Sequence, residues 1–370
     1  MQKALTPSPV YFAWLDGLRG VAALCVVVFH YHHFYLIDWQ DRPNIPKPDQ
    51  FPFSGVLLPI YENGGYAVQL FWVISGFVFA HVYFRRRSSL PGFVIARFAR
   101  LYPLHFATLL IVTFLQWLSI IGVGHWQIYG NNDVRHFMLQ LILASNWSTL
   151  SRGLSFNGPI WSVSLEIVAY FIFYFSLPVL RKYPLFGAII FVVLGFGFSA
   201  YWPAHVPFIS KAVAPCVGYF FIGTAVYAAN YIGGDKHKSG IIILGASAVA
   251  FAAGYCTFQR ELLVVAVSVI LVSVAVRLDA AGLKAPAPLM FLGRTSYSIY
   301  LVHVPLQMGV LIFADFVLGG TRFFAQSAWL MPVYLTATLA FAHISYKWLE
   351  RPANAFFHYR VRRPGQRVED

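Results

Sequence analysis

The sequence predicts an all-α polytopic integral membrane protein, with about ten transmembrane helices around an intramembrane cavity. Of its 370 residues, 58% are hydrophobic and only 11% are charged, whereas a soluble domain carries about 25% charged residues. Apolar runs recur along the chain, and most are long enough to cross a hydrocarbon layer roughly 30 Å thick. Arginine, histidine and glutamate residues lie inside some of these runs. Such groups generally face a cavity, because contact with lipid is costly.

Each long apolar run is expected to be a helix, because a membrane-spanning segment must satisfy its own backbone hydrogen bonds. The expected spans are residues 17–36, 65–84, 97–121, 160–180, 185–201, 212–231, 240–256, 261–277, 290–314 and 328–349. The apolar run 136–147 is too short to cross, so we interpret it as a membrane-dipping or interfacial helix. Residues 37–64 are rich in proline and carry mixed charge, and we expect a loop there.

A single membrane domain is expected over residues 15–355. Residues 1–14 are expected to form a short cytoplasmic lead, and residues 356–370 a basic cytoplasmic tail. Most of the 27 lysine and arginine residues lie in segments on the same side as the two termini. By the positive-inside rule, this distribution predicts cytoplasmic termini in the plasma (inner) membrane. The net charge of +13 does not indicate nucleic-acid binding, because the basic residues are spread over the loops.

The first apolar run contains Arg19 near its start and His30 eleven residues later. At about 100° and 1.5 Å per residue, this spacing places both side chains on one face of an α-helix, roughly 16 Å apart. A histidine at membrane depth can stay neutral and act as a general base. The structural alternative is a snorkelling arginine beside a packed histidine. His32 and His33 are expected to point away from this face, with His33 near its rim, and their spacing does not favour a metal site.

The third expected span begins with the motif RFAR, in which Arg97 and Arg100 are three residues apart. Side chains with this spacing are neighbours on a helix, so two guanidinium groups converge at the edge of the membrane. A pair of this kind suits a phosphate group, because each guanidinium can donate two parallel hydrogen bonds. The alternative is simple anchoring by positive charge on the cytoplasmic side.

Residues 159–171, PIWSVSLEIVAYF, place Ser162 and Glu166 four residues apart on one helix face. Glu166 is the only acid in that span, and a buried carboxylate needs a partner to remain charged. A capping role at the start of the helix is the alternative interpretation. The pattern therefore indicates either a charged group in a cavity or a local structural contact.

Residues 296–303, SYSIYLVH, place Ser296 and His303 seven residues apart on one face, with Tyr300 between them. Three polar side chains on one stripe of a membrane helix suggest that the stripe lines a cavity. Hydrogen bonding between helices is the alternative, because polar side chains also hold membrane helices together.

These motifs together resemble the membrane-bound acyltransferase-3 family. The motifs that carry the resemblance are LDGLRG with His30, LFWVISGFV (70–78), RFARLYPL (97–104), NGPIWSVSLE (157–166), SYSIYLVH (296–303) and WLERP (348–352). The resemblance runs from residue 15 to about residue 355, and six motifs in the same order make it specific. It implies about ten membrane helices and transfer of an acetyl or other short acyl group from cytoplasmic acyl-CoA. The implied acceptor is a hydroxyl of an envelope glycan, lipopolysaccharide or exopolysaccharide.

The resemblance also implies roles for individual residues. Arg19 and His30 correspond to the essential pair of the family, and Arg97 and Arg100 correspond to arginines associated with donor binding. His30 would act as a general base or as a transient acyl carrier. Glu166 would then orient His30 or balance the charge of its imidazolium. The expected substrate-binding residues are Trp161, Ser162, Tyr300 and His303.

The alternative function is a transporter or flippase of a lipid-linked or acylated glycan. Ionisable groups buried in a membrane also mark transport pathways, but the chain has no obvious inverted repeat. A non-catalytic scaffold would leave the buried arginine, histidine and glutamate unexplained. The favoured interpretation therefore has acyl-CoA, a glycan or glycolipid acceptor and the lipid bilayer as partners, without nucleic acid or metal.

Overall fold

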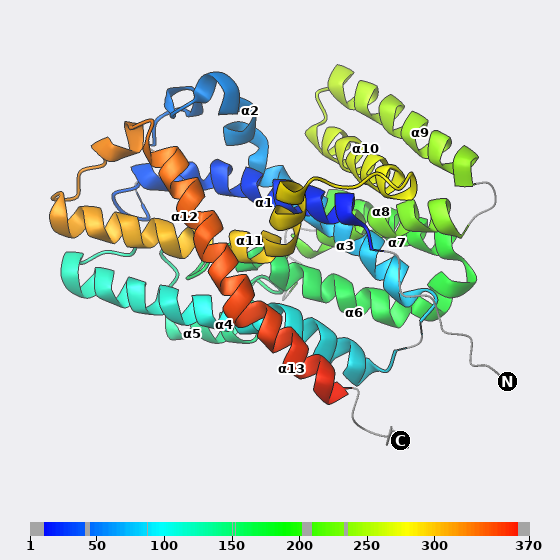
Figure 1. Ribbon diagram of the computed structural model, residues 1–370, viewed down its shortest axis with the longest axis horizontal. Coiled ribbons are helices and arrows are strands. Elements are labelled where there is room, and N and C mark those ends of the chain that lie inside the picture. The colour runs from blue at the N-terminus through cyan, green and yellow to red at the C-terminus, as the bar shows by residue number, and fades with distance from the viewer. Residues whose placement is uncertain are drawn as a thin grey trace.

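The computed structural model describes residues 11–40, 45–86, 88–149, 151, 153–201, 209–232 and 236–361, and within these residues the chain forms helices and no strand (Figure 1). The α-helices are α1 (Ala13–Phe29), α2 (Ser54–Asn63), α3 (Ala67–Tyr83), α4 (Leu90–Val123), α5 (Val134–Leu141), α6 (Ile160–Lys182), α7 (Pro184–Tyr201), α8 (Val213–Tyr231), α9 (Lys236–Cys256), α10 (Arg260–Ala280), α11 (Ala287–Val317), α12 (Leu330–Ser345) and α13 (Arg351–Val361). A short 3-10 helix, η1 (His30–Tyr35), continues α1, and a π-helix, η6 (Tyr346–Glu350), joins α12 to α13.

Among the described residues, 8 helical segments are long and apolar enough to cross a membrane. This result confirms the prediction of an all-helical polytopic membrane protein. The expected spans 240–256 and 328–349 are also helical and correspond to α9 and α12. The apolar described part of α9, Gly245–Cys256, and the 16-residue helix α12 are shorter than the others.

Two expected irregular segments contain helices. The loop expected over residues 37–64 includes α2, which packs against α1 and is fixed at Tyr61, whose hydroxyl donates to the Pro52 carbonyl at 2.7 Å. The tail expected from residue 356 begins inside α13, which packs along α4 through an edge-on contact between Phe357 and Phe98. Tertiary packing thus orders segments whose composition alone suggested loops. Residues 1–10 of the expected lead and 362–370 of the expected tail lie outside the described residues.

Helices α1 and α11 lie side by side along most of the length of α1 (Figure 1). Glycines on both helices permit this approach. A Cβ atom placed on Gly20 would lie 2.4 Å from the backbone carbon of Leu292, and one on Gly293 would lie 2.6 Å from the carbonyl oxygen of Asp16. Small residues at such an interface let two membrane helices pack backbone to backbone. The α1–α11 contact fixes how the ionisable residues of α1 meet the polar stripe of α11.

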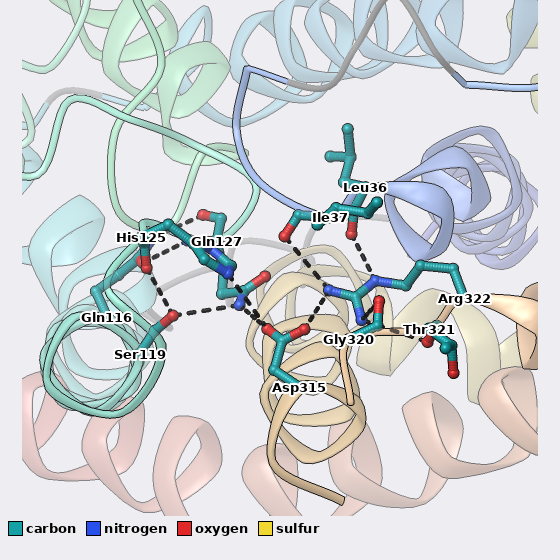
Figure 2. A network of polar contacts seen from close by, with 10 residues as sticks. All are labelled: Leu36, Ile37, Gln116, Ser119, His125, Gln127, Asp315, Gly320, Thr321 and Arg322. Atoms are coloured by element: carbon teal, nitrogen blue, oxygen red, sulfur yellow. Dashed lines mark hydrogen bonds and ion pairs between the residues drawn. The ribbon is translucent and has the colours of Figure 1, made fainter. Parts of the chain in front are cut away.

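A buried polar network fastens the C-terminal end of α11 to the segment that follows η1 (Figure 2). Asp315 and Arg322 form an ion pair of 2.6 Å between side chains that are almost fully buried. Arg322 also donates from Nε to the carbonyl oxygen of Leu36 at 2.7 Å, and Gln127 donates to the second oxygen of Asp315. Because its polar atoms have partners, this buried pair avoids much of the desolvation cost of an isolated charge. The network anchors the chain just beyond the histidines of η1.

We predict that Gly293→Ala lowers the stability of the protein, whereas Gly309→Ala on the same helix does not. The added methyl group at residue 293 would meet the backbone of α1, but at residue 309 it meets nothing within 4 Å. In an open helical position, alanine is more favourable than glycine by roughly 0.8–1.0 kcal/mol. Thermal unfolding of both variants in detergent measures the difference. Equal melting temperatures would contradict a close α1–α11 contact.

Candidate active site

A cavity inside the helical bundle is lined by residues of α1, α3, α4, α6 and α11, and we call it the arginine pocket. Its lining includes Arg19, Ser75, Arg97, Arg100, Glu166 and Tyr300. An adjoining entrance cleft shares Arg19, Arg97, Arg100, Ser296 and Tyr297 with it. The entrance cleft has a volume of about 490 Å³ and the arginine pocket about 80 Å³. The three arginines therefore lie where the larger cleft and the smaller pocket meet.

Arg19 is held in the wall of this cavity by contacts with α1 and α11. Its Nη2 lies 3.1 Å from the carboxylate of Asp16, and its Nε donates to the Ser296 hydroxyl at 2.9 Å. A second bond joins Nη2 to the carbonyl oxygen of Gly293 at 3.2 Å. The guanidinium is therefore fixed by partners, in contrast to the snorkelling alternative.

Arg97 and Arg100 lie one helical turn apart on α4 and line both the arginine pocket and the entrance cleft. The guanidinium of Arg97 lies over the ring of Phe79, 4.8 Å from its centroid. Its Nε is buried without a hydrogen-bond partner, and neither arginine forms an ion pair within the described part of the chain. Two cations that face a cavity without a paired carboxylate form a favourable place for an anionic group.

Two carboxylates lie close to the arginines. Glu166 lines the arginine pocket together with Ser75 and Tyr170, and lies near Arg100 and Arg19. Glu350, at the end of η6, lines the entrance cleft and accepts a hydrogen bond from Ser298. The structure thus places Glu166 among the arginines, and its predicted action on His30 stays a prediction. The sequence reasoning used the WLERP motif only for the family resemblance and did not single out Glu350.

Ser162 and Tyr300 line the arginine pocket, and their hydroxyl oxygens lie 2.8 Å apart. The hydroxyl of Tyr300 also donates to the carbonyl oxygen of Pro159 at 3.0 Å. Trp161 packs edge-on against Trp72, which is itself a lining residue. The structure therefore brings Ser162 and Tyr300 together in the wall and places Trp161 behind it.

His30 meets His303 of α11. The Nδ1 atom of His30 and the Nε2 atom of His303 are 3.1 Å apart, and the two rings stack with centroids 5.1 Å apart. Tyr300 lies one turn before His303 on the same stripe of α11, with ring centroids 6.1 Å apart. The polar stripe predicted from residues 296–303 thus connects the arginine pocket to His30.

His33 also belongs to this cluster, which corrects the expectation that it points away from His30. The α-helix ends at Phe29, and η1 is a 3-10 helix. With three residues per turn, residues i and i+3 lie on the same face, so the His33 ring stacks on His30 with centroids 4.9 Å apart. The expectation assumed 3.6 residues per turn throughout, and nothing in the sequence marked the change.

Gln307 is a further residue that the sequence reasoning missed. Its Nε2 donates to the backbone carbonyl of His30 at 2.8 Å, and its Oε1 lies 2.9 Å from Nδ1 of His33. It is fully buried on α11, one turn beyond His303. Extension of the stripe from Ser296 through His303 by one more turn would have found it.

The helix α11 contains Pro305 beside these residues and continues through it. Proline has no backbone N–H, so the carbonyl group four residues earlier, that of Leu301, lacks its helical partner. The side-chain amide of Asn157 donates to this carbonyl at 3.1 Å. The loop that carries the NGPIW motif therefore completes the backbone of α11 next to His303.

Comparisons with known proteins bear on what this arrangement does. Residues 12–347 match a family model described as an acyltransferase domain, of the acyltransferase-3 type. Over 184 residues the chain is 31% identical to "Acyltransferase MdmB" from Streptomyces mycarofaciens, covering 49% of this chain and 43% of that protein. Over 120 residues it is 38% identical to "Protein 2 in picA locus" from Rhizobium radiobacter, covering 31% of this chain and 51% of that protein. The chain thus spans about half the length of these curated relatives, and no solved structure matches it.

Proposed function

This chain belongs to the acyltransferase-3 family, and on that premise we propose that it moves an acetyl or other short acyl group from cytoplasmic acyl-CoA to a glycan hydroxyl. The acceptor is an envelope or exported glycan, such as an exopolysaccharide or lipopolysaccharide. One observation carries the proposal: Ser296 and Tyr300 line the arginine pocket, and the same stripe of α11 carries the buried His303, which contacts His30. A transporter or flippase would have no use for an acyl donor, and the family match favours the enzyme.

The donor is proposed to bind at the entrance cleft. Coenzyme A carries several phosphates and a long, thin arm that ends in the thioester. Arg97 and Arg100, with Arg19 at the edge of the inner pocket, supply charge-assisted hydrogen bonds to phosphate. The arm would extend from the entrance cleft into the smaller arginine pocket and along α11 toward Tyr300 and His303.

The chemistry is proposed to occur at His30. As a general base, His30 takes the proton of the acceptor hydroxyl while its oxygen attacks the thioester carbon. The carbon–sulfur bond then breaks, and the thiolate takes that proton and leaves as coenzyme A. A transient acyl group on His30 is the second route. Glu166 would balance positive charge in the pocket, and Ser162 and Tyr300, which line it, would contact the substrate.

We predict that Arg97→Ala and Arg100→Ala each weaken binding of acetyl-CoA by roughly 1.5–3 kcal/mol, because a charge-assisted contact to phosphate is lost. Lysine at either position should restore binding only in part, because it cannot form two parallel hydrogen bonds. Calorimetric titration of the purified protein with acetyl-CoA measures both effects. Lys182→Ala, which removes an exposed cation at the end of α6, is the matched control. An unchanged affinity in the Arg97 and Arg100 double variant would favour simple membrane anchoring.

We also predict that both termini are cytoplasmic, because most basic residues share their side of the membrane. In a Cys256→Ser background, an impermeant maleimide added to intact cells should label Val56→Cys but not Lys182→Cys. Val56 is 81% exposed on α2. Lys182 is exposed at the C-terminal end of α6, which is expected on the cytoplasmic side. Labelling of Lys182→Cys in intact cells would contradict this topology, and lysed cells provide the control for reactivity.

A further inference from the structure

Three fully or almost fully buried polar side chains surround the His30 backbone and ring: His303 and Gln307 at 0% exposure, and His33 at 1%. A buried polar side chain is costly unless its hydrogen bonds are satisfied. His303 and Gln307 come from one face of α11, on either side of Pro305. Three buried polar side chains around one histidine indicate that they fix the orientation of its ring.

The direction of one hydrogen bond in this cluster follows from chemistry alone. A carbonyl oxygen can only accept, so the Gln307 atom that contacts the His30 carbonyl must be the amide nitrogen. Its Oε1 therefore faces His33 and accepts from Nδ1–H. Gln307 thus fixes the tautomer of His33 and the backbone of His30 together.

The contact between Nδ1 of His30 and Nε2 of His303 holds one hydrogen, so one ring donates and the other accepts. The proposed base needs the lone pair of its Nε2, so the neutral His30 ring carries its hydrogen on Nδ1. Nδ1–H of His30 then donates to Nε2 of His303. The hydrogen of neutral His303 is on Nδ1, which is buried and has no hydrogen-bond partner among the described residues.

From this geometry we infer that His303 is a positioning residue, which accepts from Nδ1–H of His30 and directs the Nε2 lone pair of His30 to the acceptor hydroxyl. The inference rests on the proposed transferase function. His303 would hold His30 in the basic tautomer, as a buried carboxylate does in a Ser-His-Asp triad. The acceptor hydroxyl and the two imidazoles then form one directed chain of hydrogen bonds.

The proton balance of the step follows this chain. The acceptor hydroxyl gives its proton to Nε2 of His30, and its oxygen forms a bond to the thioester carbon. The His30 ring becomes an imidazolium, and its Nδ1–H bond to neutral His303 strengthens because the donor is now charged. When the carbon–sulfur bond breaks, Nε2 returns the proton to the thiolate. His303 exchanges no proton, so it acts through His30 alone.

The test compares His303→Leu with His303→Gln in the purified full-length protein, with radiolabelled acetyl-CoA and an envelope glycan fraction of the source cells. Leucine removes the acceptor, and we expect the turnover number per mole of folded protein to fall about 10²-fold, the lower range for loss of a general base. Glutamine supplies a carbonyl oxygen to His30 and should restore at least about a tenth of wild-type turnover. Affinity for acetyl-CoA should be unchanged in both variants, because the arginines lie elsewhere.

His105→Leu is the matched control. His105 is also a fully buried histidine, and its Nε2 contacts the carbonyl of Gln140 at 2.7 Å, in α4 rather than at the site. Its loss should lower stability and leave the turnover of folded protein near that of the wild type.

If His303→Leu does not fold, His303→Met replaces it as the apolar variant to be compared with His303→Gln. The positioning role would be overturned if the apolar variant had wild-type turnover, or if the turnover of His303→Gln were no higher than that of the apolar variant. Neither result would contradict the transferase function. A wild-type protein that transfers no acetyl group would instead overturn the proposed function itself.

Discussion

The close packing of α1 against α11 is the constraint on which the site depends. Because Gly20 and Gly293 allow the two backbones to touch, side chains of α1 reach the polar stripe of α11 directly. Arg19 bonds Ser296 at one end of this contact, and His30 meets His303 at the other. The separation between the donor-side arginine and the histidine pair is therefore set by the helices themselves. A larger side chain in place of Gly20 or Gly293 would separate the two helices, and would therefore displace both the arginine end and the histidine end of the site.

Irregular backbone supports the histidine end of this contact. The change from α-helix to 3-10 helix after Phe29 brings His33 onto the face of His30. Pro305 within α11 leaves a carbonyl that Asn157 satisfies, and the residue before Asn157, Phe156, has a left-handed φ of 42°. Non-glycine residues in that region are costly and cluster at functional sites. The ion pair of Asp315 with Arg322 then holds the chain beyond η1. Each irregular feature lies within a few residues of the histidine pair in sequence, or is hydrogen-bonded to a residue that does.

The sequence predicted the parts of this structure that follow from regular helices. Apolar length located the membrane helices, and a period of 3.6 residues correctly grouped Ser296, Tyr300 and His303 on one stripe of α11. The same period failed for His33, because η1 has three residues per turn. It also could not pair Asp315 with Arg322, since the chain between them leaves the helix. Helices α2 and α13 were missed because tertiary contacts, rather than composition, order them.

The central claim, that His30 performs the transfer, is tested most directly by the acyl transfer rate of His30→Ala per mole of folded, membrane-inserted protein. If His30 is the general base, the rate should fall by roughly 10²–10⁴-fold, and by more if it carries the acyl group. Acetyl-CoA should still bind, because the arginines that would hold it belong to the entrance cleft and the arginine pocket. A folded His30→Ala protein with near wild-type turnover would contradict the account. In that case the histidine pair would serve only to pack α1 against α11.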